Sequence, residues 1–288
     1  MIEGVLNVDK PAGPTSHDVV RQVRRLAQAR RVGHAGTLDP LATGVLVLAL
    51  GRATRLLEYV VGQPKTYEAR LRLGQTTTTY DAEGAIVSEQ PVAASEQALK
   101  AALAPFRGEI EQVPPMYSAV RKEGQRLYEL ARQGVEVERE ARAVTIYALD
   151  LLRWQPPHAD LRVVCSVGTY IRTLAHDLGQ ALGCGAYLAA LRRTAVGHFT
   201  LEDAVPLPAL TAENVVDYLQ PPDRAVATLP RLILAQEAAQ RLAQGQWLTR
   251  HAGEPEAALV RAYDAAGTFV GIVAAAGPQW RPRKIFYG

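Results

Sequence analysis

Residues 31–44 read RVGHAGTLDPLATG, and this stretch decides how the first half of the chain folds. It places three glycines and one proline around a lone carboxylate, that of Asp39. Glycine permits tight turns and close backbone approach, while Pro40 restricts Asp39 to an extended or turn conformation. The apolar residues 45–50 that follow have the length of a buried strand. We therefore expect an ordered loop that leads into a buried strand.

Asp39 is a candidate catalytic residue, because catalytic groups often sit on loops that a rigid scaffold holds in place. The same side chain could instead form an ordinary Asx-turn with its own backbone. The residues of the loop alone leave both interpretations open.

Residues 15–28, upstream of the loop, have the pattern of an amphipathic helix. Apolar side chains recur at helical spacing at Val19, Val20, Val23, Leu26 and Ala27. Thr15 followed by Asp18 is typical of a capping box at a helix start. The opposite side carries His17, Arg21, Arg24, Arg25 and Gln28. We expect this helix to bury one face and present a basic one.

Residues 66–73, downstream of the loop, alternate as a half-buried strand does, with Tyr67 on the inward side. Residues 161–167 repeat this pattern with Val167 as the last inward residue, and residues 171–182 read as the next helix. Further strands are expected at 4–8, 45–50, 143–152 and 195–200, and further helices at 95–105 and 124–133. The irregular alternation favours an α+β fold with a mixed sheet over a doubly wound one.

A domain boundary is expected within residues 206–230, where five prolines occur in a stretch with little strand pattern. The residues beyond it form short alternating segments separated by glycines, which is typical of a small β-rich domain. We predict a domain at 1–228, with an insertion at about 92–140, and a second domain at 229–288.

Composition and motifs exclude several classes of protein. The chain of 288 residues has no apolar run of the ~18 residues that a transmembrane helix needs, and its start lacks the pattern of a signal peptide. A cytoplasmic protein without a membrane partner is expected. Cys165 and Cys184 lack metal-ligand spacing, so we expect them to be reduced and buried and expect no metal site. Neither a P-loop nor a dinucleotide fingerprint occurs.

Basic residues are concentrated around the loop. Seven arginines lie between positions 21 and 55, with Asp39 as the only acidic residue among them. A local field of this kind suits a polyanion such as nucleic acid. A solvated helix face is the alternative for the part contributed by residues 15–28.

Six segments occur in an order that resembles the TruB family of tRNA pseudouridine synthases. They are KPAGPTS (10–16), GTLDPLATG (36–44), KTYEARLRLGQTTTTYDAEG (65–84), PPMYSA (114–119) with residues 124–132, GTYIRTL (168–174) and LRRTAVGHF (191–199). They span most of residues 1–200, and six motifs in one order are far more specific than any single motif. The last ~60 residues are similar in position and character to a compact PUA-like RNA-binding domain.

The resemblance implies an enzyme that isomerises the uridine at position 55 in the T-loop of tRNA. It implies a mainly antiparallel sheet domain of the pseudouridine synthase type, followed by the PUA-like domain. The reaction breaks a C1′–N1 bond, turns the uracil and rejoins it through C5. It involves no oxidation and no group leaves the RNA, so no cofactor is required. The T-stem-loop of tRNA is the implied partner, a monomer without an obligatory protein partner is expected, and a further tRNA-folding role is possible for such an enzyme.

The resemblance also implies three catalytic residues. Asp39 is the carboxylate that acts on the sugar or the ring, and the motif match makes Arg172 its cationic partner. A buried carboxylate tends to protonate, so a cation beside it would keep it charged. Tyr67 is expected to stack on the flipped uracil, which is worth ~1–3 kcal/mol per base, and its hydroxyl could help remove the C5 proton. Plain core packing is the alternative for Tyr67.

Substrate-binding roles are implied for residues in the same motifs. His34 would fill the space that the flipped base leaves, and Lys10 and Arg31, with the arginines of residues 15–28, would contact phosphates. Tyr170 and Leu191 resemble pocket residues, although core packing is the alternative, and Asp81 resembles an acidic group beside the pocket.

Three competing functions stay open at this point: a non-catalytic RNA-binding or RNA-folding protein, a hydrolase with an Asp nucleophile, and a guide-RNA-dependent synthase. A hydrolase usually has a second carboxylate or a metal nearby in sequence, and a guided enzyme normally implies partner proteins. The sequence does not distinguish whether Asp39 attacks the ring, attacks the sugar or removes a sugar proton.

Overall fold

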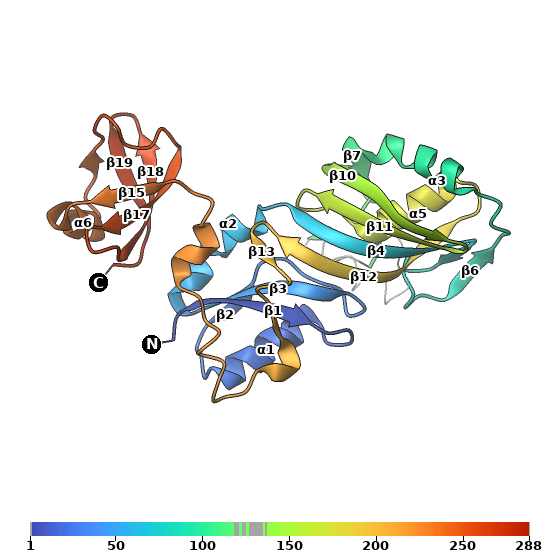
Figure 1. Cartoon of the computed structure of the whole chain (residues 1–288), viewed down its shortest axis with the longest axis horizontal. Helices are drawn as coiled ribbons and strands as arrows, with labels where there is room; N and C mark the ends of the chain where they lie inside the picture. The colour runs from blue at the N-terminus through green and yellow to red at the C-terminus, as the bar shows by residue number, and fades with distance from the viewer. Residues whose placement is uncertain (1, 118–120, 123–124, 127–134, 136, 288) are drawn as a thin grey trace.

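A ten-stranded mixed sheet forms the larger part of the molecule, and a five-stranded sheet lies at one end of it (Figure 1). The computed structural model describes residues 2–117, 121–122, 125–126, 135 and 137–287. Two pairs of neighbouring strands in the large sheet are parallel and the others are antiparallel. The α+β class with a mixed, mainly antiparallel sheet is therefore confirmed.

Eight strands form the main path of the large sheet. Their order is β14 (Val205–Pro206), β1 (Gly4–Lys10), β3 (Thr43–Leu50), β12 (Ala186–Val196), β4 (Lys65–Leu73), β11 (His158–Cys165), β10 (Arg142–Gln155) and β7 (Gly108–Gln112). Two short strands lie off this path, β2 (Val32–His34) beside β3 and β13 (Phe199–Thr200) beside β12. The strand expected at 45–50 forms the last six residues of β3, all of them buried.

β12 joins the two halves of this sheet. It pairs in parallel with β3 over two residues and antiparallel with β4 along most of its length. Gly44 of β3, at φ +103°, lies opposite Arg193, and a Cβ there would be 2.2 Å from the Arg193 carbonyl oxygen. Only glycine permits this approach, so Gly44 lets the strand that follows the Asp39 loop reach the centre of the sheet.

Helix α1 (Ser16–Leu26) covers the half of the sheet around β1 and β3, as the pattern of residues 15–28 predicted. Its N-cap Thr15 and Asp18 form the capping box, and Val19, Val20 and Val23 are buried. The ends of the helix differ slightly from the expected bounds because Thr15 has extended dihedrals and Ala27 already belongs to the cap.

Helix α5 (Ile171–Ala181) lies against β12. A Cβ on Gly179 would be 2.1 Å from the Ala186 nitrogen, which shows how closely the helix approaches the start of that strand. Four short helical elements lie between α1 and β7: η1 (Gly51–Leu56), α2 (Leu57–Val61), α3 (Glu96–Ala102) and η2 (Ala104–Phe106). The helix expected at 95–105 is therefore split into α3 and η2.

Three more of the expected elements differ from the structure. The strand expected at 195–200 is a hairpin, since β12 ends at Val196, Gly197 turns at φ +54° and β13 returns. β11 ends at Cys165, so Val167 lies in the next loop with 50% of its surface exposed instead of facing inward. The helix expected at 124–133 falls mostly outside the described residues, and its part at Gln125–Arg126 is strand β9, paired with β8 (Arg121–Lys122).

Residues 206–230 are not an open linker. They contain η3 (Leu207–Ala209) and η4 (Pro222–Val226), and the backbones of Val5 and Gln220 exchange hydrogen bonds of 2.8 Å. Val215 is fully buried against the core of the large sheet. The prolines therefore shape a packed segment that belongs to the larger part of the molecule.

The smaller sheet consists of β15 (Arg231–Leu234), β16 (Leu248–Thr249), β17 (Leu259–Asp264), β18 (Phe269–Ala276) and β19 (Gln279–Ile285), with helix α6 (Gln236–Ala243) packed against it. Phe286, which follows β19, packs against the large domain. Its ring centroid lies 5.9 Å from the guanidinium carbon of Arg52 and 5.5 Å from that of Arg55. Arg55 also donates to the Ile285 carbonyl at 2.9 Å. The β-rich character expected for the C-terminal residues is present, and the boundary at 228–229 stays a prediction.

Two further expectations concern the whole chain. Cys165 and Cys184 are both unpaired thiols and both buried, as expected. In the part of the chain that the structure describes, no helix has the length and apolar character needed to cross a membrane.

Candidate active site

A cavity of about 880 Å³ opens between the Asp39 loop, the start of α5 and the turn at residues 79–83. It is large enough for a nucleoside, since ligand cavities commonly measure ~300–1,000 Å³. Most of the predicted site residues line it, namely His34, Asp39, Tyr67, Asp81, Tyr170, Arg172 and Leu191. The two that do not are Lys10 and Arg31. The motifs quoted from the sequence, which are far apart along the chain, therefore meet at one place.

The loop around Asp39 is held on both sides by side chains from the first motif. Ser16 Oγ accepts from the Leu38 N–H at 2.8 Å and donates to the Leu38 carbonyl at 3.0 Å. On the other side, the ammonium of Lys10 donates to the Pro40 carbonyl at 3.3 Å. Ser16 is the first residue of α1, so the helix that carries the basic face also fixes the position of the carboxylate.

The Asp39 carboxylate forms an ion pair with Arg172. Arg172 Nε lies 3.0 Å from Asp39 Oδ2, and Arg172 Nη1 lies 3.3 Å from Asp81 Oδ2. The Arg172 side chain is only 6% exposed and that of Asp81 3%, whereas Asp39 keeps 36% of its side-chain surface open to the cavity. Within the described residues no backbone N–H is bonded to the Asp39 carboxylate, so the Asx-turn alternative is not supported. The ion pair expected from the sequence is in place, and its part in catalysis stays a prediction.

Arg172 is fixed by two further contacts. Its Nη2 donates to the Tyr117 carbonyl at 2.8 Å and its Nη1 to the Thr79 carbonyl at 3.3 Å. A planar guanidinium can serve several acceptors in fixed directions, which an ammonium cannot do. Arg172 thereby connects the Asp39 loop, the turn at residue 79 and the segment ending at Tyr117 around one charge.

Burial raises the pKa of Asp39 above the usual value for an aspartate, and the positive charge of Arg172 opposes this shift. Asp81 raises the pKa further through like-charge repulsion, while Lys10 lowers it. Removing water from a carboxylate disfavours its charged form, and a nearby cation restores it. Asp39 therefore depends on Arg172, with help from Lys10, to stay ionised in the cavity.

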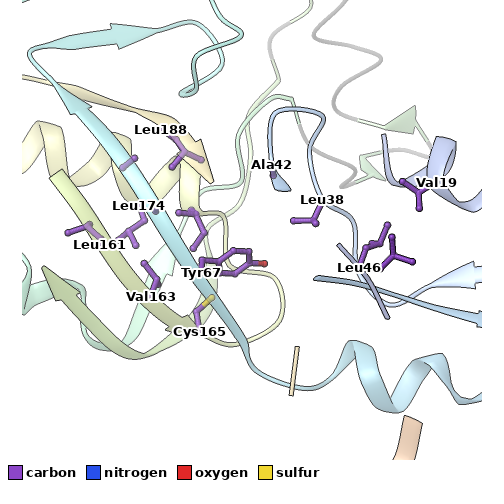
Figure 2. Close-up of a cluster of buried hydrophobic side chains, with 14 of the residues drawn as sticks. Val19, Leu38, Ala42, Leu46, Tyr67, Leu161, Val163, Cys165, Leu174 and Leu188 are labelled. Atoms are coloured by element: carbon purple, nitrogen blue, oxygen red, sulfur yellow. The ribbon is translucent and has the colours of Figure 1, made fainter. Parts of the chain in front are cut away.

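Tyr67 extends from β4 toward the loop that carries Leu38, with its hydroxyl at the end nearer the loop (Figure 2). The residue is 8% exposed and lines the cavity. Burial raises the pKa of the Tyr67 hydroxyl, and the charge and hydrogen bonding of Arg193 act in the opposite direction. Tyr67 is thus a core residue and a cavity residue together, so the two interpretations left open by the sequence are compatible.

Tyr170 and Leu191 complete the walls. The side-chain amide of Gln112 holds the backbone of Tyr170, accepting from its N–H at 2.9 Å and donating to its carbonyl at 3.2 Å. Leu191 lies on β12 opposite Ala69, and its carbonyl accepts from the Thr43 hydroxyl at 3.4 Å. Both residues line the cavity from elements that the large sheet positions.

Lys10 does not occupy the position expected of a phosphate contact. The residue is fully buried, and its ammonium donates to the carbonyls of Pro11, Pro14 and Pro40 at 2.9, 2.8 and 3.3 Å. Burial lowers its pKa to about 8, and Asp39 opposes the shift. This position does not support the predicted phosphate role of Lys10, because the ammonium is buried and enclosed by three carbonyls.

Two further buried cations were not singled out from the sequence. Arg193 is 1% exposed and Lys65 5% exposed, and both line the cavity. Lys65 donates to the carbonyls of Val61 and Gln63, and burial lowers its pKa to about 8. Both belong to motifs quoted above, but their residue types are mostly found at protein surfaces, so the pattern alone predicts exposed side chains.

Exposed arginines lie on and just after α1, the helix whose first residues line the cavity. Arg24, Arg25, Arg30 and Arg31 are exposed, and Arg21, also exposed, is paired with Asp18. His34 lines the cavity on this side and contacts His17 edge to face, at 6.1 Å between ring centroids. Burial lowers the pKa of His34, and His17 contributes in the same direction. The surface expected to contact phosphates is therefore present at Arg31 and on α1.

The described residues contain no group of three His, Cys, Asp or Glu side chains that could hold a metal ion. The groups gathered in the cavity are a carboxylate, several fixed cations and a phenol. Such a set can stabilise charge and move protons.

Solved structures with the same fold define the class of protein. A chain of an H/ACA ribonucleoprotein bound to a substrate RNA containing 2′-deoxyuridine matches with a TM-score of 0.76 at 27% identity, covering 99% of this chain and 85% of that chain. A chain of a Cbf5–Nop10–Gar1 complex matches with a TM-score of 0.77 at 29% identity, again covering 99% and 85%. The fold is that of the pseudouridine synthases.

Sequence comparison identifies the family. Residues 24–171 match the model described as the N-terminal domain of the TruB family pseudouridylate synthases. Residues 172–239 match a tRNA pseudouridylate synthase B C-terminal domain, and residues 229–286 match a C-terminal domain of tRNA pseudouridine synthase II. The chain belongs to the TruB family of pseudouridylate synthases.

Curated relatives share nearly the whole length of the chain. The tRNA pseudouridine synthase B of Ralstonia nicotianae is 48% identical over 99% of this chain and 95% of its own length. The protein of the same name from an Azoarcus species is 46% identical over 99% and 95%, and that of Pseudomonas aeruginosa 48% identical over 94% and 91%. The resemblance found in six motifs therefore extends through the C-terminal domain.

Proposed function

We propose that this chain isomerises the uridine at position 55 in the T-loop of tRNA to pseudouridine, with Asp39 as the catalytic carboxylate. The observation that carries this proposal is the ion pair of Asp39 with Arg172 inside a cavity that Tyr67 also lines. The family makes the enzyme an isomerase of uridine, and relatives named tRNA pseudouridine synthase B make tRNA its substrate.

The geometry supplies a charged carboxylate in a confined space. Asp39 has 36% of its side-chain surface open to the cavity, while Arg172 behind it is enclosed. An ionised carboxylate is needed whether Asp39 attacks C6 of the ring, attacks C1′ of the sugar or removes a sugar proton. The ion pair therefore serves all three routes.

The cavity walls retain the detached ring. After the C1′–N1 bond breaks, the uracil must turn and form the C1′–C5 bond, N1 must gain a proton and C5 must lose one. Tyr67 supplies a flat face and a hydroxyl on one side, and Leu191 an apolar wall. An enclosed site also excludes water that would intercept the reaction.

The target must leave the folded T-loop to reach Asp39, at a cost of a few kcal/mol. In this proposal His34 occupies the vacated space, and Arg31 with the exposed arginines of α1 holds the RNA backbone. The exposed arginines on α1 and before β2, two elements with residues that line the cavity, support that placement. The C-terminal domain, held by Phe286 against the large domain, adds RNA contacts of its own, and the whole chain has a further role in tRNA folding.

The proposal includes no cofactor, no metal and no obligatory protein partner, with a monomer acting in the cytoplasm. The solved relatives in H/ACA complexes are bound to other proteins, so a requirement for such partners is a testable alternative. Activity of the purified chain alone on tRNA would answer it.

Tritium release from tRNA labelled at uridine C5 tests the catalytic role. Wild type should release one tritium per tRNA without added metal or cofactor. Asp39→Asn should release none and still bind the RNA. Asp150→Asn is a matched control, because Asp150 is a carboxylate paired with an arginine, Arg162 at 3.7 Å, on a strand away from the cavity. Release by Asp39→Asn at the wild-type rate would show that the proposal is wrong.

The same assay tests the position of the target. A T-stem-loop RNA in which cytidine replaces uridine 55 should release no label from its remaining uridines. Release from that RNA would place the reaction at another uridine while leaving the role of Asp39 intact. A non-catalytic RNA-binding protein would show binding by wild type and no release from either RNA.

A further inference from the structure

Arg193 is the largest charged side chain that the core of the molecule encloses. It is 1% exposed, and no carboxylate forms an ion pair with it among the described residues. An enclosed charge without an ionic partner is costly, and it persists only where many hydrogen bonds compensate it. Its position therefore needs an explanation beyond packing.

The backbone of Arg193 lies where the two halves of the large sheet meet. It is the register partner of Gly44 on β3 and of Tyr67 on β4. β3 follows the Asp39 loop directly, and β4 carries Tyr67. Arg193 is thus the one residue of β12 whose backbone neighbours are the strand of the catalytic loop on one side and Tyr67 on the other.

The side chain of Arg193 repeats this connection. Nε donates to the Val45 carbonyl at 2.7 Å, Nη2 to the Gly36 carbonyl at 3.0 Å and Nη1 to the Thr37 carbonyl at 3.3 Å. Gly36 and Thr37 form the turn that precedes Leu38 and Asp39, and Val45 follows the loop. The guanidinium of Arg193 therefore binds the backbone on both sides of the Asp39 loop and holds its two ends together.

Tyr67 is the antiparallel register partner of Arg193, so the two side chains project from the same face of the sheet, and both line the cavity. Burial raises the pKa of the Tyr67 hydroxyl, and the nearby positive charge of Arg193 opposes this shift, so the arginine favours the ionised phenol. Because all three strong contacts of Arg193 are to neutral carbonyls, its charge is not cancelled by an acid and remains available to this hydroxyl.

We propose that Arg193 is a positioning residue for the reaction: it ties the turn before Asp39 to the hydroxyl of Tyr67, so that the carboxylate and the phenol face the same base. It also supplies the positive field that stabilises the Tyr67 phenolate, which forms when the hydroxyl gives its proton to N1 of the detached uracil and which then takes the proton that C5 loses. This inference rests on the proposed function. Arg172 pairs with Asp39 and Asp81, whereas Arg193 sets the relation between Asp39 and Tyr67.

Kinetics of Arg193→Lys test the proposal, because lysine keeps the charge and loses the fork of donors. The expected result is a fall in kcat of about 10- to 100-fold, the size of effect that small displacements of catalytic groups produce, with KM for tRNA changed less than about 3-fold. The matched control is Arg192→Lys, one residue away on β12, where the arginine is partly exposed and paired with Asp9 at 2.8 Å. That control should keep wild-type kcat.

A double-mutant cycle separates positioning from general stability. In a Tyr67→Phe background, which lacks the hydroxyl, Arg193→Lys should cost less than about 3-fold in the single-turnover rate. An equal loss in both backgrounds would overturn the proposal, as would a loss that appears only in KM. Lack of turnover by wild type on tRNA would instead contradict the proposed function.

Selective ¹⁵N-arginine NMR keeps the proposal falsifiable if Arg193→Lys fails to fold. In otherwise wild-type protein, Tyr67→Phe should shift the Arg193 Nη resonances and leave Nε, which is bonded to Val45, unchanged. Unchanged Nη resonances would show that the guanidinium does not contact the hydroxyl, and this measurement requires no catalysis.

Discussion

Arg172 Nε lies 3.0 Å from Asp39 Oδ2, and the same guanidinium reaches Asp81 and two main-chain carbonyls. One arginine thus faces two carboxylates, of which only Asp39 is open to the cavity. Asp39 is the carboxylate that can react, and Asp81 fixes the position of Arg172.

Replacing Arg172 with lysine should therefore cost far more than the retained charge suggests. An ammonium cannot serve Asp39, Asp81 and the carbonyls together, so the loss is expected to be ~2–4 kcal/mol, or roughly 30- to 1,000-fold in kcat. Single-turnover measurement with tRNA checks this. Arg107→Lys is the matched control, because Arg107 also donates through Nε and Nη2, at 3.1 and 2.7 Å, but only to the Leu149 carbonyl. A near-normal kcat in Arg172→Lys would show that the several donors of the guanidinium are not needed for catalysis.

Asp39→Asn should stabilise the protein at neutral pH while abolishing catalysis. Burial raises the pKa of Asp39 in the folded state, so the folded protein binds more protons than the unfolded chain between the two pKa values. The free energy of unfolding then falls as pH rises through this window, and the penalty is complete above the folded pKa. Urea unfolding of both proteins across pH checks this: the advantage of Asp39→Asn should disappear below the ordinary aspartate pKa of ~3.9.

The activity of wild type should depend on the same titration of Asp39, but it should rise with pH where the stability falls. The ionised carboxylate is the reactive form, so kcat/KM should rise with pH through a value above the ordinary aspartate pKa. An acidic limb at or below that ordinary value would show that Arg172 and Lys10 outweigh burial.

Local sequence patterns predicted the elements that position Asp39 and Tyr67 separately. The capping box and apolar stripe of α1 and the alternation of β4 are local signals, and both are present. The motif match placed Arg172 with Asp39, although the helix pattern alone could not show that Arg172 is enclosed. These signals can be read from the sequence because each depends on residues only a few positions apart.

β12 was missed, and with it the role of Arg193. Its sequence AYLAALRRTAV is rich in alanine, leucine and arginine, which favour helices, and bulges after Leu188 and Arg193 break its alternation. The strand forms because β3 and β4 flank it, a long-range context that overrides propensity. Lys10 was misplaced for a related reason: its type predicts exposure, whereas carbonyls of the loop it supports satisfy its charge.

RNA binding should distinguish Lys10 from Arg31 by its dependence on salt. Arg31 is exposed three residues before His34, so Arg31→Gln should reduce the slope of log Kd against log salt by about 0.7–0.9, the contribution of one phosphate contact. Lys10→Met should leave the slope unchanged and lower kcat instead, because the ammonium supports the Pro40 carbonyl next to Asp39. Titrations of a T-stem-loop at several salt concentrations check both variants. A reduced slope in Lys10→Met would restore its phosphate role.

A stacked pair of rings fastens the turn that carries Asp81. Tyr80 and His176 are stacked with 4.0 Å between ring centroids and 15° between planes, and Tyr80 adopts φ +64°, which is unusual for a tyrosine. His176 lies one turn beyond Arg172 on α5, and Tyr80 directly precedes Asp81. The stack therefore links the two segments that hold the Arg172–Asp81 pair.

Removing either ring should loosen this pair without touching the cavity. Tyr80→Ser and His176→Ala should each cost ~0.5–1.5 kcal/mol in the free energy of unfolding, the usual value of an aromatic pair, and should lower kcat by up to about 10-fold with KM unchanged. Tyr80→Phe keeps the ring and should retain both stability and kcat. Urea unfolding and single-turnover kinetics on the three variants check this.

If Tyr80→Phe lost as much stability and kcat as Tyr80→Ser, the hydroxyl and not the stack would be responsible. If His176→Ala lost stability but kept kcat, the turn would hold Asp81 without the stack, and the backbone contact between Asp81 and Leu188 of β12 would be the anchor instead.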